Sequence, residues 1–176
     1  MSESRSTILV VYYSRSGTTR RIAEMLAAEL GADIEAVREQ GANVSRAGAR
    51  GYLRSLIDAL CRRQVRIMPA LHDPSRYELV VMGSPVWAGH ASAPALAWLT
   101  EHGGQIRHLA LFCCLGGRGA KPALEQMAGS AHKTPVATCW ITAHDMRQRV
   151  DGERRQGFAQ KIRHKLAARL EPEWGV

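Results

Sequence analysis

The chain has 176 residues, of which 45% are hydrophobic and 23% are charged. These proportions are those of an ordinary globular domain, so they exclude a disordered chain and a fibrous repeat. The 24 lysines and arginines outnumber the 16 acidic residues and give a net charge of +8, which makes acidic molecules a class of partner to consider.

The first part of the chain alternates between strand and helix patterns. The run Ile8–Tyr13 has no interior polar residue, which is typical of a strand buried on both faces of a parallel sheet. Apolar residues then recur at helical spacing over 22–30, and Gly31 is a typical helix end. We expect an edge strand at 34–36 and a second helix over 53–60.

Three further strand–helix units follow. They predict strands at Leu79–Met82, Leu109–Phe112 and Val136–Ile141. Helices are expected to begin at Pro94 and Pro122, because proline suits the first turn of a helix. Apolar residues at helical spacing over 158–170 predict a last helix. Five such units predict one three-layer α/β domain over residues 1–176, with a parallel sheet.

The compartment is predicted from what the sequence lacks. The longest apolar runs are far shorter than the roughly 20 residues that span a bilayer. No signal-peptide pattern opens the chain, and the four cysteines have neither disulfide-scaffold nor zinc-site spacing. We therefore expect a reduced, cytoplasmic protein with no metal site.

Ligands of open α/β sheets bind beyond the carboxyl ends of the strands, where the strand order reverses. The first such loop reads Ser14, Arg15, Ser16, Gly17, Thr18 and Thr19. Its hydroxyls and glycine precede a helix, whose N-terminal N–H groups attract anions. Ordinary N-capping is the alternative, but four hydroxyl residues are more than a cap needs, so the pattern favours a phosphate site.

This order of residues resembles the FMN-phosphate loop of the flavodoxin superfamily, and two later loops extend the resemblance over the whole chain. The second candidate loop contains Ser84, Pro85, Val86, Trp87, Ala88 and Gly89. The third contains Cys114, Leu115, Gly116 and Gly117. The resemblance implies a doubly wound flavodoxin-like fold, with a five-stranded parallel sheet of order 2-1-3-4-5, and FMN as the cofactor of these three loops.

The residue types of these loops suit a flavin. Trp87 could form a flat apolar wall, and Gly116 and Gly117 would let the backbone approach the ring. A core aromatic under a loop is the alternative reading of Trp87. Adjacent Cys113 and Cys114 are expected to point to opposite faces of the sheet as buried thiols, because side chains alternate along a strand.

Two features differ from typical electron-carrying flavodoxins, which are acidic and place an aromatic in the third loop. This chain is basic, and residues 115–119 include no aromatic. The leading hypothesis is an FMN-dependent redox protein, either an electron carrier or a small NAD(P)H:quinone-type oxidoreductase of the shorter reductase-like branch. Its partner would be a redox protein or a small-molecule electron acceptor.

A binding module on the same fold is the alternative function. Its arginine-rich segment 46–66 would dock an acidic partner or nucleic acid. The segment matches no recognisable nucleic-acid motif, so nucleic acid is the less favoured of the two.

Overall fold

A computed structural model of the protein describes residues 6–41 and 65–170. The helix expected over 53–60 and nearly all of the arginine-rich segment 46–66 lie outside the described residues. The elements that follow therefore belong to the remainder of the chain.

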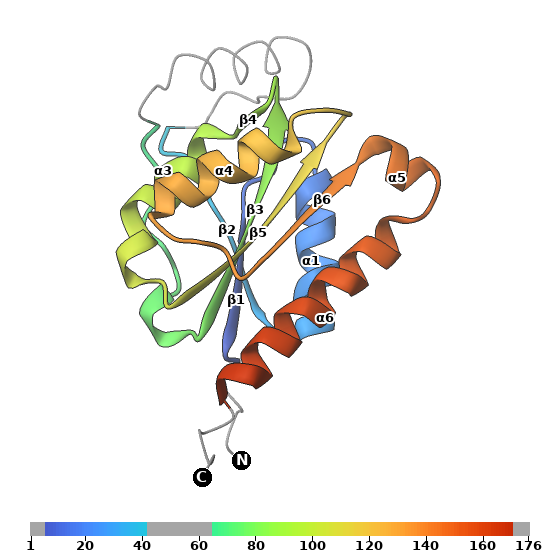
Figure 1. Cartoon of the computed structure of the whole chain (residues 1–176). Coiled ribbons are helices and arrows are strands. Elements are labelled where there is room, and N and C mark those ends of the chain that lie inside the picture. Colours follow the sequence, from blue (N-terminus) through green and yellow to red (C-terminus); the bar gives the residue numbers. More distant parts are fainter. Residues whose placement is uncertain (1–5, 42–64, 171–176) are drawn as a thin grey trace.

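A parallel sheet forms the centre of the molecule (Figure 1). Its strands, in chain order, are β1 (Ile8–Tyr12), β2 (Asp33–Ala36), β3 (Leu79–Trp87), β5 (His108–Leu115) and β6 (Ala137–Thr142). They lie side by side in the order β2-β1-β3-β5-β6. This is the predicted order 2-1-3-4-5, with one addition: the short strand β4 (His90–Ala91) pairs antiparallel with β3.

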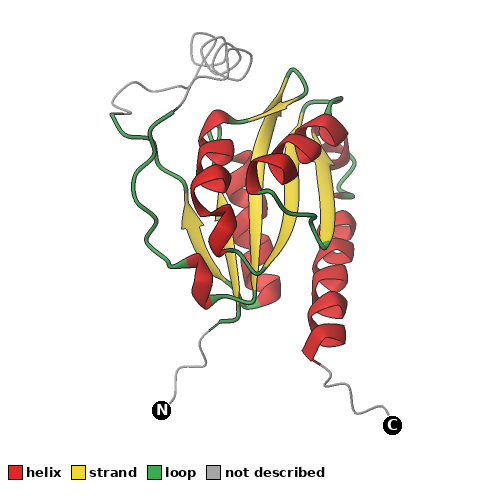
Figure 2. Cartoon of the chain, turned by 60° about the vertical axis from the view of Figure 1, so that its left-hand side comes forward, coloured by secondary structure: helices red, strands yellow, loops and turns green. Residues whose placement is uncertain are grey.

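Helices cover both faces of this sheet, as Figure 2 shows. One face is covered by α1 (Thr18–Leu30) and α6 (Asp151–Leu170), which contact each other, and the other by α3 (Ala93–His102) and α4 (Ala120–Ala131). A short helix, α5 (Ala143–Arg147), joins β6 to α6. Two single 3₁₀ turns lie at Pro74–Arg76 and Gly103–Gln105. The predicted three-layer α/β architecture is confirmed.

The sheet is buried on both sides because β1 is apolar at every position and β3 and β5 are apolar at most of theirs. In β1, Leu9 and Val11 pack with α3 and α4, whereas Val10 faces α1 and α6. β2 at the sheet's margin is only partly buried, as its alternating pattern predicts. Trp98 of α3 is 1% exposed and lies in the core, as expected for an aromatic on a helix.

Two of the predicted strand ends and one connection are wrong. The strand expected at Leu79–Met82 is longer, because β3 continues to Trp87 and the chain turns only at Ala88 and Gly89. The strand at 109–112 likewise continues to Leu115, and β3 and β5 stay paired from Leu79↔His108 to Val86↔Leu115. Helix α5 was not expected.

Gly83 lets β3 continue past the Phe112 ring, which lies against the strand in the core. A Cβ atom at Gly83 would lie 2.1 Å from Cζ of Phe112. Glycine there is therefore a packing requirement within a strand, and it is not the sign of a turn that its residue type suggests.

Candidate functional site

One pocket lies at the carboxyl ends of β1, β3 and β5, with a volume of about 400 Å³. That volume is within the range of small-molecule sites. Four segments of the chain line it: the β1–α1 loop, the end of β3, the end of β5 with the loop after it, and α5. The lining residues are Arg15, Ser16, Thr18, Thr19, Pro85, Val86, Trp87, Ala88, Cys114, Leu115, Gly116, Gly117, Arg118, Ala143 and Met146.

The β1–α1 loop presents the N-terminus of α1 to this pocket. Gly17 has φ 93°, a left-handed conformation that glycine adopts without strain, and its N–H donates to Oγ of Ser14 (3.1 Å). No side chain caps α1, and its first turn has no acidic residue. The positive end of the helix is thus directed at the pocket without a carboxylate to neutralise it, which suits an anion.

Thr19 joins this loop to the third one. Its side chain is 2% exposed and forms a hydrogen bond with the Cys114 thiol. Burial raises the pKa of Cys114 to about 12, although the Thr19 contact acts in the opposite direction. The thiol is therefore protonated at neutral pH and does not act as a nucleophile.

Trp87 forms another wall of the pocket and is contacted by the first loop. The guanidinium carbon of Arg15 lies 5.1 Å from the centroid of the Trp87 ring, within the range of a cation–π contact. After Trp87 the chain reverses through Ala88 (φ 49°) and Gly89 (φ 78°). Left-handed conformations at both positions are those of a two-residue hairpin turn, and at Ala88 this conformation is strained.

A close contact between two glycines holds this hairpin in place. A Cβ atom on Gly119 would lie 2.5 Å from Cα of Gly89. The backbone of the β3–β4 hairpin therefore packs directly on the residue that precedes α4. Since Gly119 also has φ 99°, no other residue fits there without strain.

The third loop is open and cationic. Gly116 and Gly117 have no neighbouring atom within 4 Å of an added Cβ, and Arg118 is exposed. Among the residues that line the pocket are two arginines, Arg15 and Arg118, and no acidic side chain. The pocket thus favours anionic ligands.

The structure brings most of the candidate site residues to one pocket and leaves four of them off its wall. Ser14 and Gly17 shape the first loop, and Gly89 forms the hairpin turn. Ser84 is fully buried, and its Oγ accepts from the N–H of Ser92 (2.9 Å). Its role is to join β3 to the start of α3 inside the core.

Three lining residues are not among the candidate site residues. Arg118 follows the glycines of the third loop, where its charge already indicated a place beside the ligand, whereas sequence reasoning missed the other two. Ala143 and Met146 come from α5. The signal for that helix is its capping box, in which the Thr142 hydroxyl accepts from the N–H of Asp145 and the Asp145 carboxylate accepts from the N–H of Thr142.

The two adjacent cysteines lie where the alternation along β5 predicts. Cys113 packs in the core beneath α3 and α4, and Cys114 in the core beneath α1 and α6. Burial raises the pKa of both thiols to about 12. They are buried thiols on opposite faces of the sheet, as expected.

Within the described parts of the chain, no cluster of three or more His, Cys, Asp or Glu side chains could hold a metal ion. Over the same residues, no helix combines the length and the apolar character needed to cross a bilayer.

A protein-family model described as Flavodoxin matches residues 7–146. This match covers most of the chain, and it agrees with the strand order and with the position of the pocket at the point where that order reverses. The chain belongs to the flavodoxin family. No curated protein matches it in a sequence search.

Solved structures share the fold at low sequence identity. A flavoprotein from Lactobacillus acidophilus NCFM in complex with FMN is 20% identical, with a TM-score of 0.67 over 81% of this chain and 97% of that one. The apo-form of the flavoprotein from the same organism is 24% identical, with a TM-score of 0.56 and coverages of 79% and 94%. A WrbA-like flavodoxin from Agrobacterium tumefaciens is 16% identical, with a TM-score of 0.57 and coverages of 91% and 99%.

Proposed function

We propose that this flavodoxin-family chain binds FMN in the pocket beside Trp87 and transfers electrons through it. The proposal rests on one observation: an uncapped helix N-terminus and an aromatic wall line the same pocket. The first suits a phosphate and the second suits a flat ring. The structurally similar flavoprotein from L. acidophilus is a complex with FMN, which supports the same cofactor here.

The phosphate would be held by the first loop. Ser16, Thr18 and Thr19 line the pocket beside the N-terminus of α1, and hydroxyl and backbone donors at such a site bind phosphate oxygens. A dianion placed there would gain the attraction of the helix dipole and of Arg15. The absence of acidic side chains from the pocket wall fits the same charge.

The ring would be held between the β3–β4 hairpin and the third loop. Trp87 supplies a wall that the contact between Gly89 and Gly119 holds in place, and the glycines after β5 leave room for the backbone to approach the cofactor. Val86 and Leu115 add apolar surface, which excludes water from the ring.

FMN, when bound, supplies the redox chemistry, and the protein supplies binding, orientation and electrostatics. Arg15 and Arg118 stabilise negative charge at the pocket. The buried thiols Cys113 and Cys114 stay protonated and take no part. Electrons would enter and leave at the exposed side of the pocket, next to Ala88 and Arg118.

The choice between an oxidoreductase and an electron carrier rests on charge. The basic chain and the cationic pocket favour a small NAD(P)H:quinone-type oxidoreductase over an acidic one-electron carrier. They also favour anionic small molecules or acidic redox proteins as partners. A cytoplasmic location, one domain over residues 1–176, and docking by segment 46–66 remain predictions of the sequence.

The direct test is titration of the purified chain with FMN, followed by the quenching of flavin fluorescence. We expect one FMN per chain, and a yellow preparation that releases FMN on denaturation. A colourless chain that does not bind added FMN would refute the proposal and favour the binding module. Steady-state assays with NADH and NADPH against quinone and cytochrome acceptors then separate the oxidoreductase from the carrier.

A further inference from the structure

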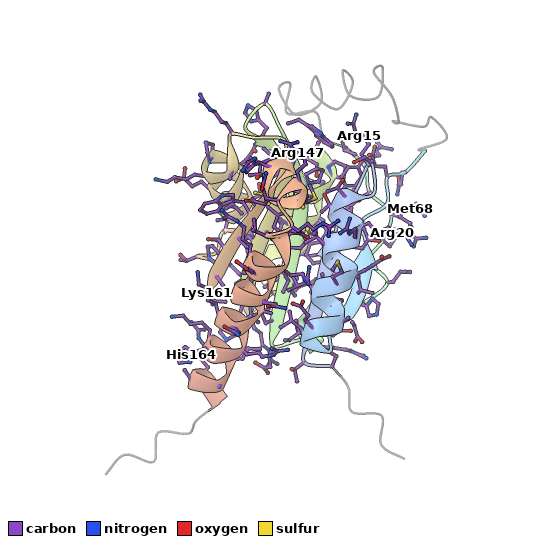
Figure 3. The ribbon with its side chains drawn as sticks, turned by 90° about the vertical axis from the view of Figure 1, so that its right-hand side faces the viewer. Arg15, Arg20, Met68, Arg147, Lys161 and His164 are labelled. Atoms are coloured by element: carbon purple, nitrogen blue, oxygen red, sulfur yellow. The ribbon has the colours of Figure 1, made fainter. Side chains whose placement is uncertain are left out.

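A row of cations follows one side of α6. Arg154, Lys161, Lys165 and Arg169 are spaced seven, four and four residues apart and are exposed, so they lie on one flank of the helix over about 22 Å. We call these four residues the basic strip. Figure 3 shows Lys161 and His164 on the side of α6 away from α1, with Arg147 above them on α5.

Contacts place the basic strip beside β6, the last strand of the sheet order. Burial raises the pKa of the Cys139 thiol on β6 to about 11, and the charges of Arg154 and Lys161 act against this rise, so both cations are close to that strand. At the other end, Arg169 Nη1 lies 2.6 Å from Nδ1 of His108. Burial, followed by the charge of Arg169, lowers the pKa of His108.

An exposed aromatic accompanies the basic strip. Trp140 of β6 is 43% exposed, because α3 and α4 pack over the neighbouring strands and leave its side of β6 uncovered. The guanidinium carbon of Arg154 lies 6.0 Å from the Trp140 ring centroid. Tryptophan and arginine together are the residue types that most often anchor protein interfaces.

Three acidic side chains on the segments around α6 have cationic partners. Asp145 Oδ1 lies 3.2 Å from Nε of Arg154, Glu29 Oε1 accepts from Nε of Arg155 (2.7 Å), and Glu78 Oε1 accepts from Nη1 of Arg107 (2.6 Å). In the described part of the chain, neither Lys161 nor Lys165 takes part in an ion pair. The strip therefore presents a net positive charge to solvent.

One end of the strip reaches the wall of the pocket. Asp145, the partner of Arg154, lies on α5 between Ala143 and Met146, which both line the pocket. A molecule that binds Arg154 and Trp140 would thus lie next to the proposed FMN site.

We propose that the basic strip and Trp140 form the docking surface for an acidic redox protein, an inference that rests on the proposed function. A second copy of this chain would bring like charges together, which opposes its binding. An anionic membrane would need exposed apolar side chains on α6. The exposed large hydrophobic residues of the described chain are Ile34, Met68, Leu71 and Trp140, and none is on α6.

The test uses the full chain and a plant-type ferredoxin, a small acidic iron–sulfur protein, as the probe. Binding is measured by fluorescence anisotropy of labelled ferredoxin at 50 and 300 mM NaCl. We expect K161E/K165E to weaken ferredoxin binding at least tenfold at 50 mM NaCl. We also expect the wild type to bind ferredoxin more weakly at 300 mM than at 50 mM NaCl. Trp140→Thr, which keeps a residue suited to a strand, should weaken binding about fivefold or more.

The control R76E/K121E makes the same change of net charge at two exposed cations away from α6, and it should change the dissociation constant less than threefold. No binding of ferredoxin by the wild type, or equal losses in both double variants, would overturn the proposal. A thymidine 20-mer that binds more tightly than ferredoxin, and loses affinity in K161E/K165E, would overturn it in favour of nucleic acid.

FMN titration of the same preparations separates this proposal from the function on which it rests. No substituted residue lines the pocket, so each variant should bind FMN as the wild type does. A chain that binds ferredoxin through the strip but does not bind FMN would refute the FMN site alone. Loss of FMN binding in K161E/K165E would show an effect on folding and would count against the strip.

Discussion

The Arg15 guanidinium carbon lies 5.1 Å from the Trp87 ring centroid, so the loop after β1 and the end of β3 meet across the pocket. The two residues are 72 positions apart in the chain, and the parallel pairing of β1 with β3 brings them together. A cation and an aromatic face in one pocket suit a ligand that carries both negative charge and a flat ring.

Replacing Trp87 with alanine should weaken FMN binding about tenfold. An aromatic stacking contact contributes roughly 0.5 to 1.5 kcal/mol beyond its buried area, and 1.4 kcal/mol corresponds to about tenfold in affinity. Flavin fluorescence titration measures the change. Trp140→Ala is the matched control because Trp140 does not line the pocket, and an equal loss in both variants would contradict the stacking role of Trp87.

The double variant S16A/T19V should lower FMN affinity by at least about 100-fold. Each hydroxyl can donate one hydrogen bond to a charged phosphate, and such bonds contribute roughly 1.5 to 3 kcal/mol. Valine at position 19 keeps the shape of a side chain that is 2% exposed. An unchanged FMN dissociation constant would place the phosphate elsewhere.

Gly119→Ala should destabilise the fold by about 2 kcal/mol or more. The new methyl group would lie 2.5 Å from Cα of Gly89, and the φ of 99° is strained for alanine. Urea unfolding measures the loss. Gly117→Ala places its methyl group in open space and should change the free energy of unfolding by less than about 0.5 kcal/mol; similar losses in both variants would argue against the contact with Gly89.

Asp145→Asn should destabilise the protein at neutral pH but not at low pH. Burial alone would raise the pKa of Asp145, but hydrogen bonds from Thr142 and the charge of Arg154 lower it below the usual 3.8. A lowered carboxyl pKa stabilises the fold above the unfolded-state pKa, and this stabilisation is lost as the pH falls through the folded-state pKa.

The difference in free energy of unfolding between wild type and D145N should therefore be complete above about pH 5 and should shrink toward pH 3 and below. Urea unfolding at pH 7, 5 and 3 measures it. Glu153→Gln is the control, because Glu153 is an exposed carboxylate on α6 and should show little effect at any of these values. A difference for D145N that stays constant with pH would contradict the role of its charge.

Arg118→Gln should lower the two-electron midpoint potential of bound FMN. Reduction adds negative charge, and a unit positive charge at about 8 Å in an effective dielectric of about 20 stabilises it by roughly 2 kcal/mol, or about 40 mV for two electrons. Because Arg118 is exposed, solvent screening should reduce the shift to about 20 mV. Anaerobic redox titration measures it, and an unchanged or higher potential would refute the role of Arg118.

Local patterns were sufficient to predict the architecture. The apolar run at Ile8–Tyr13 predicts a buried strand, because a strand buried on both faces needs an apolar side chain at every position. The helical spacing of apolar residues after it predicts a helix. The hydroxyl-rich loop 14–19 follows the first strand and precedes a helix, so its place at the binding edge of the sheet follows from the general topology of such folds.

The full shape of the pocket depends on contacts between distant residues. β3 extends to Trp87 because β5 pairs with it up to Val86 and because Gly83 leaves space for the Phe112 ring. The sequence pattern predicted that this strand ends at Met82. Ser84 has the residue type of a binding residue, yet its partner Ser92 lies within the core.

The sequence by itself determined the alternation of strands and helices, the first loop and the opposite orientations of Cys113 and Cys114, because each follows from a local pattern or from the alternation of side chains along a strand. The strand order was implied by the resemblance to the flavodoxin superfamily. Tertiary structure alone decided that α5 closes the pocket, that the Gly89–Gly119 contact holds the hairpin, and that the cations of α6 lie along β6. These features require the positions of segments that are far apart in the chain. Residue type and spacing do not specify such positions until the sheet has been assembled.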